Sequence, residues 1–347
     1  MMMCVSSSKM RSLCVVLWAV VAVWGGAGVV GGAVGLSPPP ATNLRPIVGI
    51  LTVPTEGSEC GTFYREHKAM SGSGSTSCFA TVYVKWLESA GARVVPIPYN
   101  LPHDVLRDLA GKYLNGLLFT GGGTSLEPET EYYQAAKVLF EAAMEANARG
   151  VYTPVHGTCM GFQLLSILVA NSTSVLESGF DSEDYSIPLD FTAAAATSRM
   201  YGPAAANPAT GVFATLATKN VTSNLHHSGV TPETFATNAK LTSFLTVLST
   251  NRGRKGRAFV SSFEGKTMPV YGTQYHPERP AYEFNPILNL NHSIAGIEAM
   301  QYLANNFVTE ARRSTASFPS PTDEAKALIY NYAPLANGES YQCYFFE

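Results

Sequence analysis

The sequence has 347 residues, of which 46% are apolar and 14% are charged, and its formal net charge is −3. This composition excludes an intrinsically disordered chain, because disorder goes with low hydrophobicity and high charge. Lysine and arginine are scattered along the chain, with a local cluster at residues 252–257. A chain without an extended basic patch is poorly suited to bind phosphates, so we expect no nucleic-acid partner.

The amino-terminal segment, residues 1–35, is typical of a secretory signal peptide. Lys9 and Arg11 precede the uncharged run 13–36, which ends in small residues suited to cleavage. The run is also long enough to span a bilayer, so an uncleaved signal anchor is the alternative. No later stretch is as long and apolar. We therefore expect residues 45–347 to form one lumenal or extracellular domain, with no membrane contact once the signal is removed.

Features of the remaining chain agree with the secretory pathway. Four cysteines follow the signal, namely Cys60, Cys78, Cys159 and Cys343. An oxidising compartment favours disulfides, but an activated nucleophile has to stay a thiol, so the pairing is left open. Three sequons for N-glycosylation begin at Asn171, Asn220 and Asn291.

Short apolar runs alternate with helical patterns along the first half of the domain. The expected strands are 46–53, 93–98, 116–119 and 151–155, and the expected helices are 80–89, 103–109, 131–148 and one starting near 162. Such β-α alternation predicts a parallel sheet with helices on both faces. A segment rich in glycine and serine, 56–77, is expected to be an exposed loop.

The second half changes character. Residues 181–251 are predicted to be loop-rich, followed by strands at 258–264 and 270–275 and a helix at 295–313. The last two strands would meet at a turn and add an antiparallel edge to the parallel centre. The expected fold is therefore an α/β/α three-layer sandwich with a mostly parallel central sheet.

A candidate nucleophile lies where the strand at 151–155 leads into a helix. Cys159 is flanked by Gly157 and Gly161, and this G-x-C-x-G spacing matches the sharp elbow that presents a nucleophile at the top of a sheet. The amino terminus of the following helix favours a thiolate over a thiol. The alternative is a small buried structural cysteine.

A proton carrier follows the strand at 270–275. An extended chain places residues two apart on the same side, so His276 and Glu278 should face the same way. Glu278 would then orient the imidazole of His276 and stabilise its protonated form. The alternative for a single histidine is a structural role.

Backbone donors are expected beside this pair. The glycine run 121–123 can present N–H groups at the carboxyl edge of the sheet, and the amides of Gly122 and Met160 would form an oxyanion hole. The glycine run continues into neither a dinucleotide-binding motif nor a lysine-containing P-loop, and no H-E-x-x-H or paired C-x-x-C appears. We therefore expect no cofactor and no metal.

Three segments together resemble the signatures of class I glutamine-amidotransferase-like hydrolases: 119–123, 157–163 and 275–278. Within that group the chain resembles the γ-glutamyl hydrolases. The supporting segments are 83–93, 188–192, 198–200, 271–283, 325–330 and 342–347. The resemblance extends from about residue 45 to the end and identifies residues 45–347 as the catalytic domain.

The resemblance implies a cysteine hydrolase that cleaves γ-glutamyl bonds of folylpoly-γ-glutamates and antifolate polyglutamates through a thioester. It assigns Cys159 as nucleophile, His276 as acid and base, and Glu278 as its partner. It also assigns His226 to the site, whereas the residues alone do not choose between His226 and His227. The resemblance also implies a location in the vacuole or lysosome, or in the extracellular space.

Substrate contacts and partners follow from the same resemblance. A small, polyanionic substrate needs cationic or N–H donors, and Arg199 and Gln163 are the candidates, with a structural arginine as the alternative. A homodimer is left open. Two other functions remain: a secreted glutaminase-like amidase, and a secreted binding protein of the same fold that has lost catalysis.

Overall fold

The computed structural model describes residues 38–58, 60–62, 76–336 and 342–347. The predicted signal segment 1–35 and most of the predicted loop 56–77 lie outside these residues, so both stay predictions. Among the helices that are described, none has the length and apolar character needed to cross a bilayer.

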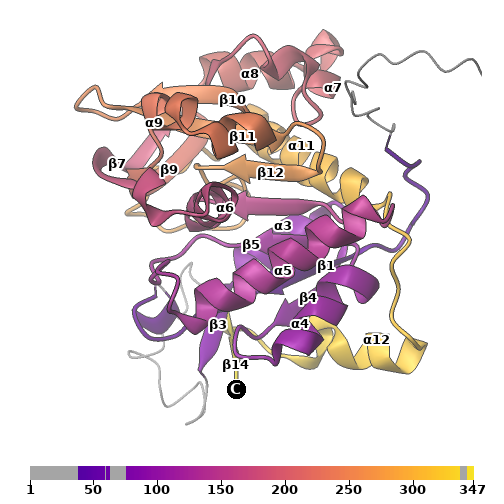
Figure 1. The fold of residues 1–347 in the computed structure, drawn as a ribbon. Helices are drawn as coiled ribbons and strands as arrows, with labels where there is room; N and C mark the ends of the chain where they lie inside the picture. Colours follow the sequence, from indigo (N-terminus) through magenta and orange to yellow (C-terminus); the bar gives the residue numbers. More distant parts are fainter. Residues whose placement is uncertain (1–37, 59, 63–75, 337–341) are drawn as a thin grey trace, which may run out of the picture. The chain divides into compact units, whose positions relative to one another are not determined.

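An eight-stranded sheet forms the centre of the fold, in the order β4-β1-β5-β6-β12-β11-β10-β8 (Figure 1). Pairing is parallel from β4 to β12 and antiparallel from β12 to β8. The strands are β1 (Ile47–Leu51), β4 (Arg93–Ile97), β5 (Gly116–Phe119), β6 (Val155–Thr158), β8 (Asp190–Phe191), β10 (Leu245–Arg252), β11 (Ala258–Gly265) and β12 (Val270–Thr273). The predicted mixed sheet is confirmed.

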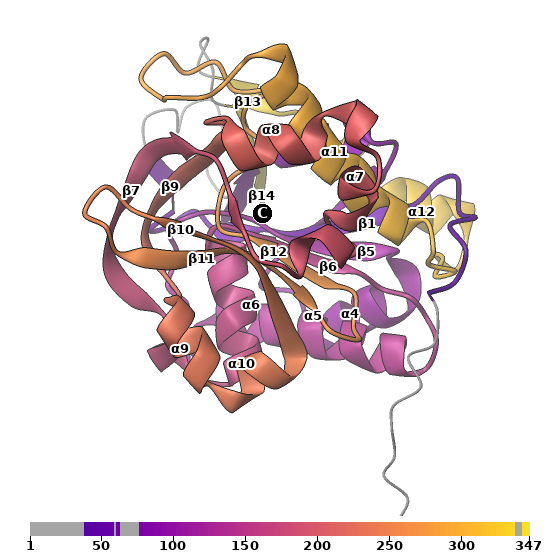
Figure 2. The same cartoon turned by 90° about the horizontal axis from the view of Figure 1, so that it is seen from above.

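Helices cover both faces of this sheet, which Figure 2 shows from above. On one face α3 and α11 pack together, and the indole Nε1 of Trp86 on α3 donates to the carbonyl of Met300 on α11 at 3.2 Å. On the other face lie α4, α5, α6 and α10. The helices are α3 (Thr81–Ser89), α4 (His103–Asp108), α5 (Glu131–Ala148), α6 (Met160–Ala170), α7 (Gly202–Ala205), α8 (Val212–Thr218), α9 (Pro232–Thr237), α10 (Ala239–Phe244), α11 (Ile294–Ala311) and α12 (Pro321–Ala327).

A second, smaller sheet ties the carboxyl-terminal strand to the amino-terminal half in the order β13-β14-β3-β2. Its strands are β2 (Val53–Pro54), β3 (Ser77–Ala80), β13 (Leu335–Ala336) and β14 (Gln342–Phe346). A disulfide joins Cys60 to Cys78 on β3, and this answers the pairing question that the sequence leaves open. Cys159 lies outside this disulfide and keeps its thiol.

The prediction that residues 181–251 are loop-rich is wrong. Strands β7 (Glu177–Ile187) and β9 (Thr222–Gly229) form a long antiparallel ribbon, in which Ser182 pairs with His226. β7 is rich in serine and acidic residues, and its register shifts twice, so no regular alternation of apolar and polar residues marks it. Its few apolar side chains, Phe180 and Ile187, pack instead against Phe259 on β11.

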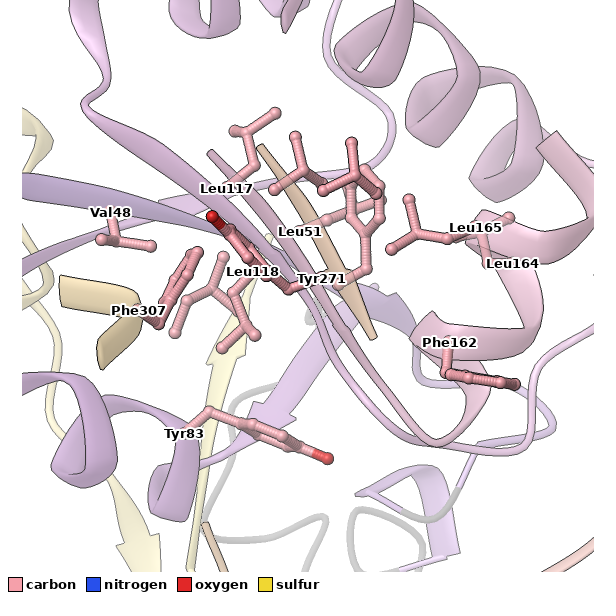
Figure 3. Close-up of a cluster of buried hydrophobic side chains, with 14 of the residues drawn as sticks. Val48, Leu51, Tyr83, Leu117, Leu118, Phe162, Leu164, Leu165, Tyr271 and Phe307 are labelled. Carbon is pink, nitrogen blue, oxygen red and sulfur yellow. The ribbon is translucent and has the colours of Figure 1, made fainter. Parts of the chain in front are cut away.

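The sheet's apolar side chains form a core between the two helical layers. Figure 3 shows Val48, Leu117 and Leu118 from the central strands, with Phe307 from α11 on one side of the strands and Phe162 from α6 on the other. The strands here are almost entirely apolar because both of their faces are buried, as expected of a parallel sheet covered on both sides.

Phe307 offers a test of this core. Its ring is 2% exposed and lies 5.3 Å from the ring of His156 on β6, so Phe307→Ala should lower the free energy of unfolding by about 3–5 kcal/mol. Phe284 is 63% exposed, and Phe284→Ala should cost less than about 1 kcal/mol. Urea unfolding followed by circular dichroism measures both values, and equal losses would contradict the assigned core.

Candidate active site

The turn between β6 and α6 holds Cys159 in a strained conformation. Its φ of 51° and ψ of −105° lie in a region that side chains other than glycine rarely adopt. The N–H of Cys159 donates to the carbonyl of Thr273 on β12 at 2.8 Å, which helps to hold the strained peptide in place. The thiol is thereby presented at the carboxyl edge of the parallel strands.

The two glycines around Cys159 are required by close approach. A Cβ atom on Gly157 would lie 2.4 Å from the carbonyl oxygen of Gly161, and one on Gly161 would lie 2.1 Å from that of Phe119 on β5. Real Cβ atoms do not approach oxygen so closely, so a side chain at either position would push the turn away from the sheet. Glycine is therefore needed on both sides of Cys159 to make the sharp turn that the G-x-C-x-G spacing predicts.

His276 and Glu278 meet just beyond the end of β12. The imidazole Nδ1 donates to the carboxylate Oε1 of Glu278 at 2.7 Å, and both side chains are almost fully buried. The N–H of His276 donates to the carbonyl of Ser223 on β9 at 2.8 Å, so the main chain of this residue is also fixed. With Nδ1 engaged in this way, Nε2 is the nitrogen left for proton transfer.

A second buried ion pair lies against this dyad. Arg279 Nη1 lies 3.0 Å from Glu283 Oε2, and Arg279 Nε lies 3.3 Å from His276 Nδ1. The N–H at Nδ1 of His276 already donates its hydrogen bond to Glu278, so Nδ1 cannot accept one from Arg279 Nε. The contact between Arg279 Nε and His276 Nδ1 therefore places two hydrogen-bond donors next to each other. Arg279 therefore opposes the positive charge on His276, while Glu283 balances the charge of Arg279.

The pKa of His276 reflects these neighbours. Burial acts to lower it, but the charges of Glu278 and Cys159 together with a hydrogen bond to Cys159 raise the pKa of His276 to about 10. The imidazole is thus held as a cation beside the sulfur. This is the arrangement that favours a thiolate.

Gly121 marks the point where the nucleophile and the dyad meet. A Cβ atom placed there would lie 2.7 Å from His276 Cε1, 2.7 Å from Tyr83 Oη and 3.4 Å from Cys159 Cβ. Its N–H donates to Tyr83 Oη at 2.8 Å and is therefore engaged. The sequence contains no signal that places Tyr83 here.

A pocket of about 640 Å³ opens from Cys159. Its wall includes the predicted oxyanion donors Gly122 and Met160 as well as Gln163 and His226. Met160 is the first residue of α6, where the N–H has no partner inside the helix, and Gly122 has a φ of 151°. Both residues line the same pocket as Cys159, and their role as oxyanion donors stays a prediction.

His226 projects from β9 into the same wall. Its Nδ1 donates to the carbonyl of Ser228 at 3.0 Å, its ring lies 4.7 Å from the ring of Phe259, and among the described residues its Nε2 has no hydrogen-bond partner. Burial lowers the pKa of His226 to about 3; the bond to Ser228 opposes this and the nearby His276 adds to it. His226 is therefore neutral, with its acceptor nitrogen buried behind the pocket wall.

The neighbouring His227 also lines the pocket, but it lies on the solvent-exposed side of β9, since successive residues of a strand point to opposite sides. Its side chain is largely exposed and its Nε2 lies 3.4 Å from Glu183 Oε2 on β7. The structure thus separates two histidines that the residue pattern alone does not distinguish.

Two buried amides complete the surroundings of the sulfur. Gln163 Nε2 donates to the carbonyl of Ser228 at 2.8 Å and lies 3.4 Å from Gln274 Oε1. Gln274 Nε2 in turn lies 3.7 Å from Cys159 Sγ. The sequence analysis does not single out Gln274, which follows directly after β12 where the chain bends.

Arg199 does not lie at this pocket, which corrects the expectation that it contacts substrate. Its guanidinium donates to the carbonyls of Gly265 and Met268 and lies 5.5 Å from the ring centre of Tyr271. These partners are at the amino-terminal end of β12, whereas the pocket is at the carboxyl end. The contacts of Arg199 with backbone carbonyls support the alternative interpretation, in which this arginine has a structural role.

In the described parts of the chain, no group of three or more histidine, cysteine, aspartate or glutamate side chains is arranged to hold a metal ion. The chemistry available at this site is that of a thiol, two histidines in different charge states, a carboxylate and backbone donors.

Comparison with known proteins adds a family. A sequence model described as Peptidase C26 matches residues 59–278. The chain is 37% identical to human Gamma-glutamyl hydrolase over 309 residues, covering 88% of this chain and 91% of that protein. It is 37% identical to Gamma-glutamyl hydrolase B of Dictyostelium discoideum over 292 residues, covering 84% and 79%. It is 33% identical to Gamma-glutamyl hydrolase 1 of Arabidopsis thaliana over 302 residues, covering 87% and 82%.

The buried, neutral state of His226 predicts an acid weakness of the fold. The unfolded chain binds a proton at His226 near pH 6.5, whereas the folded protein does so only at about pH 3, so stability from this group is lost as the pH falls through that interval. Between pH 7 and pH 4 the free energy of unfolding of the wild type should fall further than that of His226→Phe. The difference between the two decreases should be on the order of 2–3 kcal/mol. Urea unfolding at both pH values measures it. The exposed control His227→Gln should behave as wild type, and an unchanged pH dependence in His226→Phe would refute the assignment.

Proposed function

The chain belongs to the Peptidase C26 family and is a hydrolase of the γ-glutamyl type, and from that premise we propose that it shortens folylpoly-γ-glutamates by a cysteine-thioester mechanism. The observation that carries the proposal is the strained Cys159 beside the buried pair of His276 and Glu278, at the mouth of a pocket of about 640 Å³. The same reaction would act on antifolate polyglutamates and lower the cell's stock of long-chain folates.

The first step is attack of the Cys159 thiolate on the γ-carbonyl carbon of a glutamyl link. A carbon–sulfur bond forms and the carbonyl electrons move to oxygen, where the N–H groups of Gly122 and Met160 stabilise the charge. The cationic His276 then gives its Nε2 proton to the departing α-amine as the carbon–nitrogen bond breaks. A thioester on Cys159 and a shortened amine product result.

The second step is hydrolysis of that thioester. Neutral His276 accepts a proton from water, whose oxygen attacks the same carbon, and the carbon–sulfur bond breaks to return the Cys159 thiolate. Glu278 stays ionised throughout and stabilises the imidazolium each time it forms. The Nε2 of His226 is buried behind the pocket wall without a partner among the described residues, so His226 can contact substrate or water only if this part of the wall moves.

Uncharged hydrogen-bond donors in the described pocket wall would bind the substrate. The described wall contains Glu127 and Glu183 but no lysine or arginine. It also contains a set of hydroxyl groups, from Thr124, Ser125, Thr173, Ser174, Ser178 and Ser228. We assign the contacts to the substrate's α-carboxylates to such hydroxyl and backbone N–H donors.

A secretory address, ending in the vacuole, lysosome or extracellular space, belongs to the same proposal. The disulfide between Cys60 and Cys78 supports it, because disulfides persist in oxidising compartments. Exposed Asn171 and Asn220, both within sequons, support it as well.

The direct test follows the mass of a folate pentaglutamate incubated with the protein. We expect stepwise or internal shortening, and a loss of at least about 10³-fold in Cys159→Ala because the nucleophile is gone. The control Ser166→Ala changes a buried residue of the same helix, bonded to the carbonyl of Phe162, and should keep activity within about twofold. Ammonia release from free glutamine without shortening would favour the glutaminase, and binding without turnover would favour the inactive binding protein.

The charge of Glu278 should set the alkaline limit of the reaction. Glu278 raises the pKa of His276, and the proton needed by the leaving amine is lost as the pH rises through that pKa. In Glu278→Gln the amide still accepts from Nδ1 but carries no charge, so the alkaline limb of kcat/KM should move to lower pH. A pH–rate profile measures the shift. An alkaline limb at the wild-type position would show that Glu278 does not act through the charge of His276.

A further inference from the structure

We propose that Gln274 is a further catalytic residue, whose side-chain amide donates a hydrogen bond to the Cys159 sulfur and stabilises its ionised form. The inference deepens the proposed mechanism and rests on Cys159 being the nucleophile. It stands on the 3.7 Å approach of Gln274 Nε2 to Cys159 Sγ, inside the protein where Gln274 has no exposed surface.

The backbone aims this side chain at the sulfur. Gln274 follows β12 directly, and its N–H donates to the carbonyl of Ser261 on β11 at 2.8 Å. The chain bends at Gln274 and Tyr275, and both Gln274 and His276 reach Cys159, Gln274 through Nε2 and His276 through a hydrogen bond. One segment therefore supplies both an acid and a neutral donor to the same atom.

The hydrogen-bond network decides which end of the amide faces the sulfur. The carbonyl of Ser228 only accepts, so the Gln163 atom 2.8 Å from it has to be the nitrogen. That nitrogen also lies 3.4 Å from one atom of the Gln274 amide, which has to be the oxygen in order to accept. The other end of Gln274, which faces Cys159, is therefore its NH₂ group.

The sulfur thus lies between two groups that favour different protonation states. The carbonyl of Leu225, 3.8 Å from Sγ, accepts a hydrogen bond from the thiol but repels a thiolate. The amide of Gln274 donates, and a donor binds an anion more strongly than a neutral group. Gln274 therefore favours the ionised sulfur both before attack and when the thioester breaks down.

Gln274 is not part of the described pocket wall, which separates its effect from substrate binding. Loss of its donor should lower kcat and leave KM unchanged. A merely structural role, as a bridge from β12 to Gln163 on α6, would instead lower stability without a selective change in the reactivity of Cys159.

The test measures how fast iodoacetamide alkylates Cys159 over a pH series, read from the mass of the peptide that contains it, and compares the variants at the acid end, where the wild-type rate falls with pH because the thiolate is the minor form. Only the thiolate reacts, with a carbon–sulfur bond formed and iodide released. Gln274→Met should slow alkylation about tenfold, as expected for loss of a hydrogen bond to a charged group. The control Asn115→Leu removes another buried amide, which bonds Ile47 N and Ala316 O at the start of β5, and should alkylate at the wild-type rate.

A second variant keeps the inference falsifiable if Gln274→Met does not fold. Gln274→Glu preserves the shape and can still accept from Gln163, but replaces the donor beside the sulfur with a carboxylate oxygen. It should slow alkylation at least as much. A folded variant of either kind that alkylates within twofold of wild type, or a kcat that does not change, would overturn the proposal.

Alkylation also separates this inference from the proposed substrate. Iodoacetamide needs no γ-glutamyl group, so a wild-type protein that leaves the pentaglutamate intact would refute the substrate assignment alone. The comparison of Gln274 variants with Asn115→Leu would still decide the role of Gln274.

Discussion

The strained peptide at Cys159 is the constraint on which the rest of the site depends. A positive φ at a residue with a side chain is costly, and it persists because the surroundings allow no other path. Gly157 and Gly161 let the turn pack against β5 within distances that exclude a Cβ atom, and β12 binds the N–H of Cys159. The same strand, β12, then delivers Gln274 and His276 to the sulfur. The position of β12 beside β6 therefore fixes both the conformation of Cys159 and the groups that contact its sulfur.

Electrostatics gives two buried histidines opposite states within this small volume. Both rings are removed from water, which by itself disfavours their charged forms. His276 has a carboxylate and a sulfur as neighbours, and its pKa rises to about 10. His226 has aromatic rings and a backbone carbonyl, and its pKa falls to about 3. The surroundings of Cys159 thus hold one histidine as a cation and the other as a neutral ring, although both are the same residue type.

Much of this arrangement could be predicted from the sequence where the pattern is local. The parallel strands are runs of apolar residues, and the elbow is a glycine frame around Cys159. His276 and Glu278 pair as expected, but through bends at residues 277–279 rather than through the extended chain on which that expectation is based. Features that depend on distant contacts could not be predicted. β7 is polar and irregular and exists because it pairs with β9, Arg199 is held by carbonyls at the far end of β12, and Tyr83 reaches Gly121 from another layer. The choice of His226 over His227 came from the resemblance, because alternation along β9 is only visible once the strand is known.

The central claim is that hydrolysis passes through a thioester on Cys159, and partition of that intermediate tests it most directly. Two substrates with the same γ-glutamyl acyl group and different leaving amines are hydrolysed in the presence of hydroxylamine, and the ratio of hydroxamate to free acid is measured. A common thioester predicts the same ratio for both substrates, because the leaving amine has departed before water or hydroxylamine attacks. A ratio that changes with the leaving amine, or hydrolysis without any hydroxamate, would contradict the account.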